Sequence, residues 1–499
     1  MRRRSRFRVL GVLAGAGLCL GLFGPAPARA DWVQLGGSLN IHPGEDAKRP
    51  SLTIQNGMPF VAWQESNTFN SYSSVYVKRY NGSSWDLVGG APLNHDRAAA
   101  AERPSLAASP AQLFVAWQED NGANWEVRVK YFETGPSWNA IGGPLNVVPA
   151  DDATNAVMAL SSSYPYVAWQ EAGGVSRIYV KHFDGGVWEA DGTSVNGASG
   201  AHFPKLAIGN DEPLVSRIED QNCRVARYNG LSWLDVDGVV DRVASSNSGA
   251  GDLVFAFGDP VCTWFEMDGT FQIYVSRFNG SGWEPLGVSQ NHTAGANAYN
   301  PKLAHDDVRL YLTWYEAGDV YVKRLTATGW EYLGTNPLDV DPARDASTPD
   351  IAAAGDGNVI VAWIEDFGLN THLRVKRWVP PATPTPTATP VLTASPTPTA
   401  TPTPADPVPE HVRTDEIIAY PIPARDRVTF AVRASQGRGE VVVRVFNTRY
   451  RLVTHLAGEA PGGEAVLHWD VRDVAPGVYY AHARVGEQSL TVTKLVVVK

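Results

Sequence analysis

The stretch Phe60-Val61-Ala62-Trp63-Gln64-Glu65 decides the fold, because its Trp-x-Glu core returns along the chain. Five further copies end in a glutamate: Glu119, Glu171, Glu266, Glu316 and Glu365. Another copy, Arg217-Ile218-Glu219, keeps the glutamate but has arginine in place of tryptophan. Successive glutamates lie 47 to 54 residues apart. A period near 50 residues, built from strand-type residues, indicates one supersecondary unit copied seven times.

Each repeat reads as four antiparallel strands. In the first repeat we expect them at 50–54, 60–65, 75–80 and 85–90. Apolar and polar residues alternate in these stretches, as they do in half-buried strands, and Asn81-Gly82 is typical of a tight hairpin turn. Four antiparallel strands in about 50 residues predict a propeller blade.

The ends of the repeat array predict how it closes. Six repeats contain a fourth strand that begins at or near a tryptophan, whereas the seventh repeat ends at Trp378 without one. The missing strand is found at the other end, in residues 31–40. We therefore predict an all-β fold: a seven-bladed β-propeller over residues 31–379, closed by pairing of the N-terminal strand with residues 373–378. Such pairing removes the two free sheet edges of an open array.

The first thirty residues have the pattern of a signal peptide. Basic residues precede the apolar run 9–23, and Ala28-Arg29-Ala30 is a small-x-small cleavage site. No later run is apolar enough to cross a membrane. The whole chain carries a net charge of −10, and without residues 1–30 it has 52 acidic against 36 basic residues. We expect a secreted or surface-attached monomer that does not bind nucleic acid, because nucleic acid requires basic patches.

Glutamate is kept in all seven repeats, at the end of the second strand. Asp46, Asp152 and Asp345 recur in the connections that we expect on the same propeller face. One interpretation is a ring of acceptors for sugar hydroxyls, or for a calcium ion that bridges to them. The alternative is that each glutamate caps a turn or accepts a hydrogen bond from a nearby backbone amide. The candidate ligand-binding residues are therefore Glu65, Glu119, Glu171, Glu219, Glu266, Glu316, Glu365, Arg217, Asp46, Asp152 and Asp345.

Two repeats break the pattern. A lysine follows the third strand in five repeats, but the fourth and fifth have Ala226 and Ser276 there. The fourth repeat also has Arg217 in place of tryptophan, and a buried arginine would need an acid such as Glu219 beside it. Cys223 and Cys262 lie at buried-type positions of these repeats, either as separate thiols or as a bridge. No Cys/His cluster has metal-ligand spacing.

The repeat motifs Pro-x-Leu-Ala, Val-Ala-Trp-x-Glu, Tyr-Val-Lys-Arg-Tyr-Asn-Gly and Trp-x-x-Leu-Gly-Gly-x-Leu-Asn resemble those of secreted bacterial β-propellers. They are distantly similar to seven-bladed bacterial lectins, whose sugar-binding residues do not map onto this repeat. Sialidase Asp-boxes, WD40 and kelch marks, Gly-x-Ser-x-Gly and His-Glu-x-x-His are absent from the sequence.

Residues 380–412 alternate Pro and Thr and predict an extended linker. Residues 413–499 predict a small immunoglobulin-like β-sandwich, with short alternating strands and Gly turns. Several motifs resemble FlgD-like immunoglobulin domains and type IX secretion sorting domains: 420–424, 445–447, 469–470, 477–479 and 494–499. Ile422 and Tyr450 depart from the residues usual there, so the resemblance implies the fold and leaves sorting open.

The sequence predicts non-enzymatic recognition of a glycan or cell-surface protein, since no residues form a catalytic constellation. One alternative is a polysaccharide-active enzyme with an irregular site near the fourth and fifth repeats. Another is a purely structural surface protein. No cofactor is expected beyond the calcium ion already considered.

Overall fold

The computed structural model describes residues 31–67, 72–161, 164–209, 212–242, 246–306, 309–354, 357–380, 412–435, 439–447, 452–460, 462–472, 474–486, 488–490 and 493–498. The predicted signal peptide, the linker segment 381–411 and Tyr450 lie outside the described residues. Within the described ranges the regular structure is β-strand, and no α-helix occurs. None of the described residues forms a helix that could cross a bilayer.

The described part of residues 31–380 forms seven four-stranded antiparallel sheets, numbered here one to seven along the chain. Sheets one to three contain β2 (Ala47–Gln55), β3 (Met58–Asn67), β4 (Tyr72–Tyr80) and β5 (Trp85–Leu87); β6 (Ala101–Ala108), β7 (Leu113–Asp120), β8 (Trp125–Phe132) and β9 (Asn139–Ala140); and β10 (Asp152–Leu160), β11 (Pro165–Ala172), β12 (Arg177–Phe183) and β13 (Trp188–Ala190). Sheets four to six contain β14 (Ala201–Gly209), β15 (Glu212–Glu219), β16 (Asn222–Tyr228) and β17 (Trp233–Val239); β18 (Ser248–Ala256), β19 (Asp259–Asp268), β20 (Thr270–Phe278) and β21 (Trp283–Pro285); and β22 (Ala298–His305), β23 (Leu310–Glu316), β24 (Asp319–Thr326) and β25 (Gly329–Tyr332).

Sheet seven joins the two ends of this part of the chain. It contains β26 (Ala346–Ala354), β27 (Asn358–Asp366), β28 (Thr371–Val379) and β1 (Asp31–Gln34). In the β1–β28 register Trp32 is opposite Trp378 and Gln34 is opposite Lys376. The predicted pairing of the N-terminal strand with residues 373–378 is therefore confirmed.

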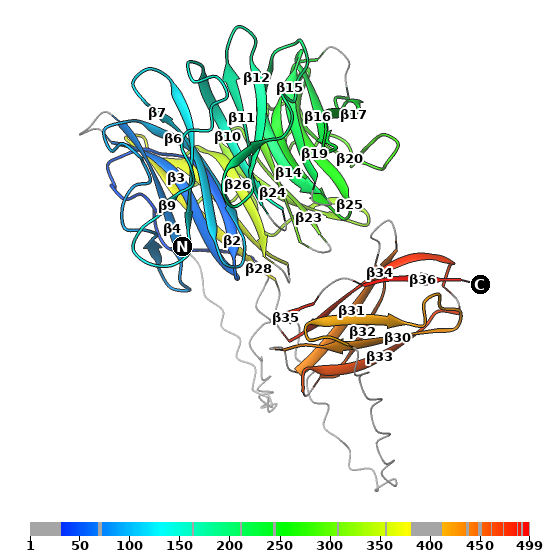
Figure 1. Ribbon diagram of the computed structural model, residues 1–499. Coiled ribbons are helices and arrows are strands. Elements are labelled where there is room, and N and C mark those ends of the chain that lie inside the picture. The colour runs from blue at the N-terminus through cyan, green and yellow to red at the C-terminus, as the bar shows by residue number, and fades with distance from the viewer. Residues whose placement is uncertain are drawn as a thin grey trace, which may run out of the picture.

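The sheets form a closed cycle of neighbours. The first strand of each sheet contacts the first strand of the next, from β2 to β6 and onward to β26, and β26 contacts β2. Figure 1 shows the sheets side by side, with yellow β26 and β28 next to blue β2. This all-β arrangement of four-stranded sheets is compatible with a β-propeller.

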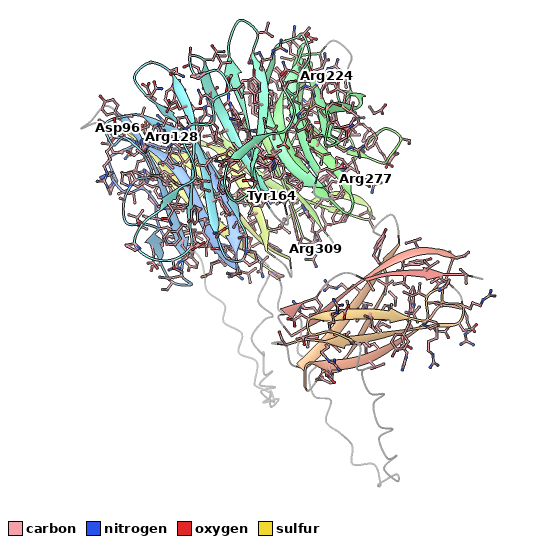
Figure 2. The ribbon with its side chains drawn as sticks, in the orientation of Figure 1. Asp96, Arg128, Tyr164, Arg224, Arg277 and Arg309 are labelled. Atoms are coloured by element: carbon pink, nitrogen blue, oxygen red, sulfur yellow. The ribbon has the colours of Figure 1, made fainter. Side chains whose placement is uncertain are left out.

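The Trp-x-Glu tryptophans fill the space between neighbouring sheets. All six are fully buried: Trp63, Trp117, Trp169, Trp264, Trp314 and Trp363. Trp63, for example, packs in a cluster that includes Ile360 and Leu373 of sheet seven. These residues therefore pack between neighbouring sheets. Arg277 (Figure 2), on the third strand β20, forms an ion pair of 2.9 Å with Glu284 on the fourth strand β21.

The part of the chain after residue 411 has a core of its own. One sheet contains β29 (Glu416–Tyr420), β30 (Arg427–Arg433) and β33 (Glu464–Asp470); the other contains β31 (Gly439–Asn447), β32 (Leu452–Ala460), β34 (Gly477–Val485), β35 (Gln488–Ser489) and β36 (Thr493–Val497). Phe430 and Val443, one from each sheet, are fully buried in the same cluster. The sequence predicts sandwich strands at 428–432, 441–446, 465–469, 477–480 and 490–498, and these do not include β29, β32 or β35. In β32 the alternation is weak, because polar residues and Gly458 interrupt the apolar ones.

Candidate functional site

The seven repeated glutamates are buried rather than open to solvent. Their exposed fractions run from 0% to 8%. Glu119 shows the usual arrangement: its carboxylate accepts the backbone N–H groups of His95 and Asp96 at 2.8 and 2.7 Å, and the indole N–H of Trp117 at 2.7 Å. The expected open acidic face is therefore not formed by these side chains. They have the hydrogen bonds that the turn-capping alternative requires, and a role in ligand binding stays a prediction.

The same pattern recurs around the ring. Pairs of backbone N–H groups donate to Glu65, Glu171, Glu316 and Glu365. Glu266 accepts the backbone N–H of Arg242 and the hydroxyl of Ser246. Each carboxylate therefore holds, by hydrogen bonds, the connection that precedes its own sheet.

Sheet four replaces this pattern with an ion pair. Arg217 is 3% exposed, and its guanidinium donates to Glu219 at 2.7–2.8 Å and to Asp235 at 2.7 Å. The expectation that a buried arginine here requires Glu219 is confirmed. Glu219 is itself buried, whereas Asp235, the other partner of Arg217, is 39% exposed.

The three predicted aspartates lie in or beside the connections before the first strands. Asp46 accepts the backbone N–H of Thr371 at 2.9 Å, and Asp152 accepts that of Trp125 at 2.9 Å. Asp345 is exposed. Among the described residues no three His, Cys, Asp or Glu side chains are grouped so that they could hold a metal ion.

A cavity of about 520 Å³ lies where the first strands of all seven sheets converge. It is lined by residues 49–51, 103–105, 155–157, 203, 205, 249–251, 300–302 and 348–350 of those strands, and by Phe265 of β19. This size falls in the range of small-ligand sites. We call it the axial cavity.

A β-bulge in each first strand brings side chains into this cavity. The register of every first strand shifts at the same place, for example between Lys48 and Ser51 in β2. In six sheets a bulge residue has a positive φ of 45–56°: Arg49, Arg103, Asn155, Phe203, Asn300 and Thr348. Sheet five has glycines there, and a Cβ on Gly251 would lie 2.0 Å from the Thr263 carbonyl oxygen. A bulge redirects the side chain that it carries.

The axial cavity is basic although the chain is acidic. Arg49, Arg103, Lys205 and Lys302 line it, against the single lining acid Asp350. Lys302 Nζ lies 3.5 Å from Asp350 Oδ1, whereas Arg49, Arg103 and Lys205 form no ion pair with any described residue. Three positive charges of the lining therefore lack an ion-pair partner among the described residues, and the acids near them, Glu102, Asp252 and Asp350, act at longer range.

Burial and the nearby charge of Lys302 lower the pKa of Lys205 to about 8. Burial also lowers the pKa of Arg103, whose guanidinium donates to Asn155 Oδ1 at 2.9 Å. Bound negative charge would relieve both effects, because it favours the charged form of each group.

The sequence analysis did not identify the axial cavity. A signal was present: Arg49, Arg103, Phe203, Asn300 and Thr348 each directly precede a proline. That recurrence marks a special backbone position in the first strand, but only the bulge shows that these side chains line the cavity.

No family model matches this sequence, and no curated protein matches it either. The resemblance of residues 413–499 to FlgD-like and sorting domains therefore stays a prediction. Solved structures do resemble the chain. A protein of unknown function from Dyadobacter fermentans is 12% identical, covers 71% of this chain and 98% of its own, and has a TM-score of 0.41.

Two carbohydrate-active proteins are also similar. A polysaccharide lyase of family PL25, an ulvan lyase, is 11% identical over 66% of this chain and 93% of its own, with a TM-score of 0.46. A Trypanosoma rangeli sialidase is 10% identical over 90% and 83%, with a TM-score of 0.39. At such identities and scores, no activity is carried from these proteins to this chain.

Proposed function

We propose that this chain is a secreted or surface-displayed recognition protein whose axial cavity binds an acidic saccharide, one that carries carboxylate or sulfate groups. The observation that carries the proposal is the set of three cations without ion-pair partners, Arg49, Arg103 and Lys205, in one cavity. Guanidinium and ammonium groups form strong, charge-assisted hydrogen bonds to such anions.

The rest of the lining suits a sugar. Asn155 and Asn300 supply amide donors and acceptors for hydroxyl groups, and Ser51 and Ser105 supply hydroxyls. Phe203, 47% exposed, and Phe265 supply apolar faces. A small inorganic anion would use the charges but not these other surfaces.

The proposed architecture is a seven-bladed propeller over residues 31–379, a linker over 380–412 and an immunoglobulin-like sandwich over 413–499. It is supported by the four-stranded sheets, the β1–β28 pairing and the separate core around Phe430. Secretion is supported by the pattern of residues 1–30 alone.

Binding assays on the full chain without residues 1–30 test the function. We expect polyuronates or sulfated polysaccharides to bind, neutral glucans not to bind, and added salt to weaken binding. R103A and K205M should each weaken binding about tenfold or more, because a hydrogen bond to a charged group contributes about 1.5–3 kcal/mol. R324A, on the third strand β24 of sheet six, is the control. Equal binding by R103A, K205M and R324A would contradict the proposal.

A second candidate, a polysaccharide-active enzyme, is favoured by the lowered pKa of Lys205. A neutral lysine amine can act as a general base, and Arg103 would neutralise the carboxylate of a uronate. The amine would take the proton from the carbon next to the carboxylate, a carbon–carbon double bond would form as the bond to the leaving sugar oxygen breaks, and that oxygen would take a proton from water. Ultraviolet absorbance of an unsaturated product, lost in K205M, distinguishes this candidate from binding alone.

A further inference from the structure

Five sheets hold a lysine ammonium in the same environment. The lysine on the third strand donates to a backbone carbonyl in the connection that precedes its sheet, and it lies 5.2–5.8 Å from the centre of the Trp-x-Glu indole. The lysine–carbonyl pairs are Lys78–Leu39, Lys130–Leu93, Lys181–Leu145, Lys323–Gln290 and Lys376–Leu338.

The buried glutamate of each sheet completes this environment. Burial lowers the pKa of Lys78, for example, and the negative charge of Glu65 opposes that shift. Lys130 and Glu119 are related in the same way. An ammonium ion is thus held by a carbonyl oxygen, an indole face and a nearby carboxylate, three groups that attract a cation. We call this set the ammonium site.

Sheet five has the site without its lysine. Trp264 and Glu266 are fully buried there, as in the other sheets, but the lysine position is occupied by Ser276, 1% exposed. The preceding connection keeps its path, since Asp241 Oδ1 accepts the backbone N–H of Cys223 at 2.9 Å. Val240 therefore occupies the place of Leu93, the residue whose carbonyl accepts the Lys130 ammonium in sheet two.

Sheet four also lacks the lysine, but it keeps a cation. Ala226 replaces the lysine, and Arg217 replaces the tryptophan and pairs with Glu219. The positive charge of sheet four is therefore on the second strand, whereas in the five lysine-containing sheets it is on the third. The second strand of sheet five keeps its tryptophan, Trp264, between Thr263 and Phe265. No arginine replaces the tryptophan in this strand.

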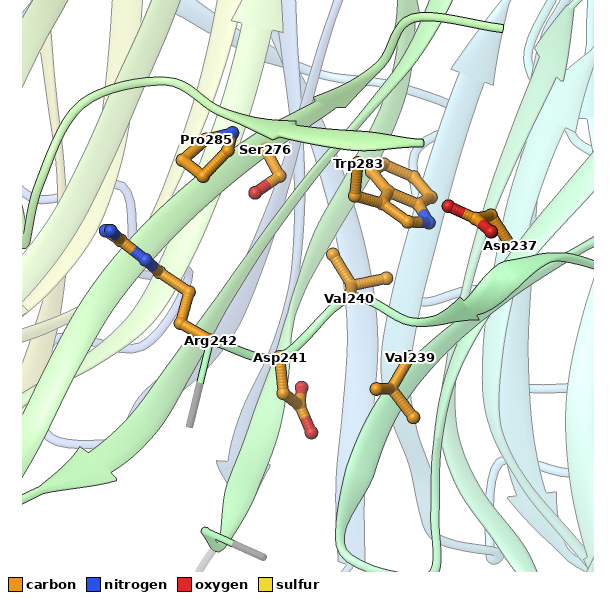
Figure 3. A pocket seen from close by; sticks show the side chains of 8 residues that line it. All are labelled: Asp237, Val239, Val240, Asp241, Arg242, Ser276, Trp283 and Pro285. Carbon is orange, nitrogen blue, oxygen red and sulfur yellow. The ribbon is translucent and has the colours of Figure 1, made fainter. Parts of the chain in front are cut away.

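A pocket of about 310 Å³ lies at the missing lysine. It is lined by Asp237, Val239, Val240, Asp241, Arg242, Ser276, Trp283 and Pro285 (Figure 3). Ser276 and Val240 are buried, whereas Asp237 and Arg242 are exposed, so the pocket has a buried floor and an open mouth.

The charges around this pocket favour a cation. Asp237 and Asp241 bring two carboxylates to the lining, and Asp241 Oδ1 accepts the backbone N–H of Cys223 in sheet four. Asp237 lies beside Trp283 at one end, and Arg242 is directed toward Pro285 at the other (Figure 3). The Arg242 guanidinium donates to the Gly287 carbonyl and lies 4.9 Å from the Tyr274 ring centre. The one basic residue of the lining therefore already has a carbonyl acceptor and an aromatic partner.

We propose that the pocket beside Ser276 is a binding site for a primary alkylammonium group, which takes the place that a lysine side chain fills in five other sheets. The group can belong to a free amine or to the side chain of a lysine residue. Its N–H donors would reach the Val240 carbonyl, and its positive charge would face Glu266 and the lining carboxylates Asp237 and Asp241.

The test is calorimetric titration of the chain, lacking only residues 1–30, with propylammonium chloride and with Nα-acetyl-lysine amide, at constant ionic strength. We expect propylammonium to bind, tetramethylammonium to bind at least tenfold more weakly because it has no N–H donor, and sodium chloride to have no effect. Binding of acetyl-lysine amide as well would assign the site to lysine side chains; propylammonium binding alone would assign it to free amines.

Ser276→Lys supplies the tethered ammonium. We expect it to raise the melting temperature and to weaken propylammonium binding at least tenfold, whereas S276A keeps the pocket and its binding. If S276K does not fold, S276L fills the pocket without a charge and should also lose binding. R103A, in the axial cavity, should bind propylammonium normally. Absence of binding to both the unsubstituted chain and S276A, or unchanged binding to S276K, would overturn the proposal.

Discussion

The indole N–H of Trp32 donates to the backbone carbonyl of Leu333 at 2.7 Å, across 301 positions of sequence. Six other tryptophans make the equivalent bond from the fourth strand of one sheet to the preceding sheet, as Trp330 does to Leu286 at 2.7 Å. Trp32 thus acts as the fourth-strand tryptophan of sheet seven, although it lies near the start of the described chain.

This bond predicts that Trp32 is needed to close the ring. Trp32 packs against Trp378 with ring centres 5.8 Å apart. W32A should lower the free energy of unfolding by about 2 kcal/mol, less than for a fully buried tryptophan because Trp32 is half-buried. W32F keeps an aromatic ring and should lose about 1 kcal/mol with the hydrogen bond. Denaturant unfolding measures both. A W32A chain as stable as the unsubstituted one would show that β1 does not hold the ring.

The surroundings of Asp339 predict that the substitution D339N stabilises the chain. In sheet two the equivalent residue is Asn94, whose side-chain N–H groups donate to the carbonyls of Ser73 and Ala99. Asp339 keeps the bond from the Val320 N–H, but its Oδ2 has no partner among the described residues. D339N should restore both donors and raise the free energy of unfolding by about 1 kcal/mol.

The effect of D339N should depend on pH. Burial, with Asp319 beside it, raises the pKa of Asp339 well above its usual range. A raised folded-state pKa stabilises the chain below the unfolded pKa of about 4, and this contribution is lost as pH rises through the folded pKa. Melting temperatures at pH 5 and pH 8.5 should therefore show a larger gap between D339N and the unsubstituted chain at pH 8.5. A gap that narrows with pH would contradict this account.

We expect substitution of Glu119 to lower the stability of the chain without weakening its binding of the acidic saccharide. E119Q replaces one carboxylate oxygen, an acceptor of backbone N–H groups, by an amide that donates, and should cost about 2–3 kcal/mol. E133Q, at an exposed glutamate, is the matched control. Thermal unfolding gives the stability, and titration with the acidic saccharide gives the affinity. An E119Q chain of normal stability with weakened binding would instead support the ligand-binding interpretation of the repeated glutamates.

We expect the thiols of Cys223 and Cys262 to be unreactive in the folded chain. Both are free and buried, with sulfur atoms 3.7 Å apart. The contact with Cys262, together with burial, raises the pKa of Cys223, so the reactive thiolate is scarce. In a chain without residues 1–30, a thiol reagent should titrate no cysteine in the native state and two after unfolding. No thiols after unfolding would show that a bridge forms.

The pKa of Lys205 predicts how the affinity for the acidic saccharide depends on pH. Its pKa of about 8 means that the ammonium is charged below pH 8 and neutral above it. Affinity for the acidic saccharide should fall as pH rises from 7 to 9.5, while K205M should show a flatter profile. Titration at three pH values measures this. Parallel profiles for K205M and the unsubstituted chain would mean that Lys205 does not touch the ligand.

The sequence by itself determined the period, the strand order in each repeat and the pairing of residues 31–34 with the last repeat. These features depend on local alternation and on counting strands, which a linear chain displays directly. It also narrowed the role of the repeated glutamates to two alternatives, because a carboxylate in a strand end can accept either from the chain or from a ligand.

Only the tertiary structure decided where the chain presents its charges. Arg49, Arg103 and Lys205 lie about 50 and 100 residues apart, and no local pattern assigns them to one place. They meet because seven bulged first strands converge and turn these side chains into the same cavity. The repeated glutamates, by contrast, are buried under the connections to which they are hydrogen-bonded. Side-chain direction at a bulge and burial at a sheet junction both depend on neighbouring sheets, and that is why the sequence could not resolve them.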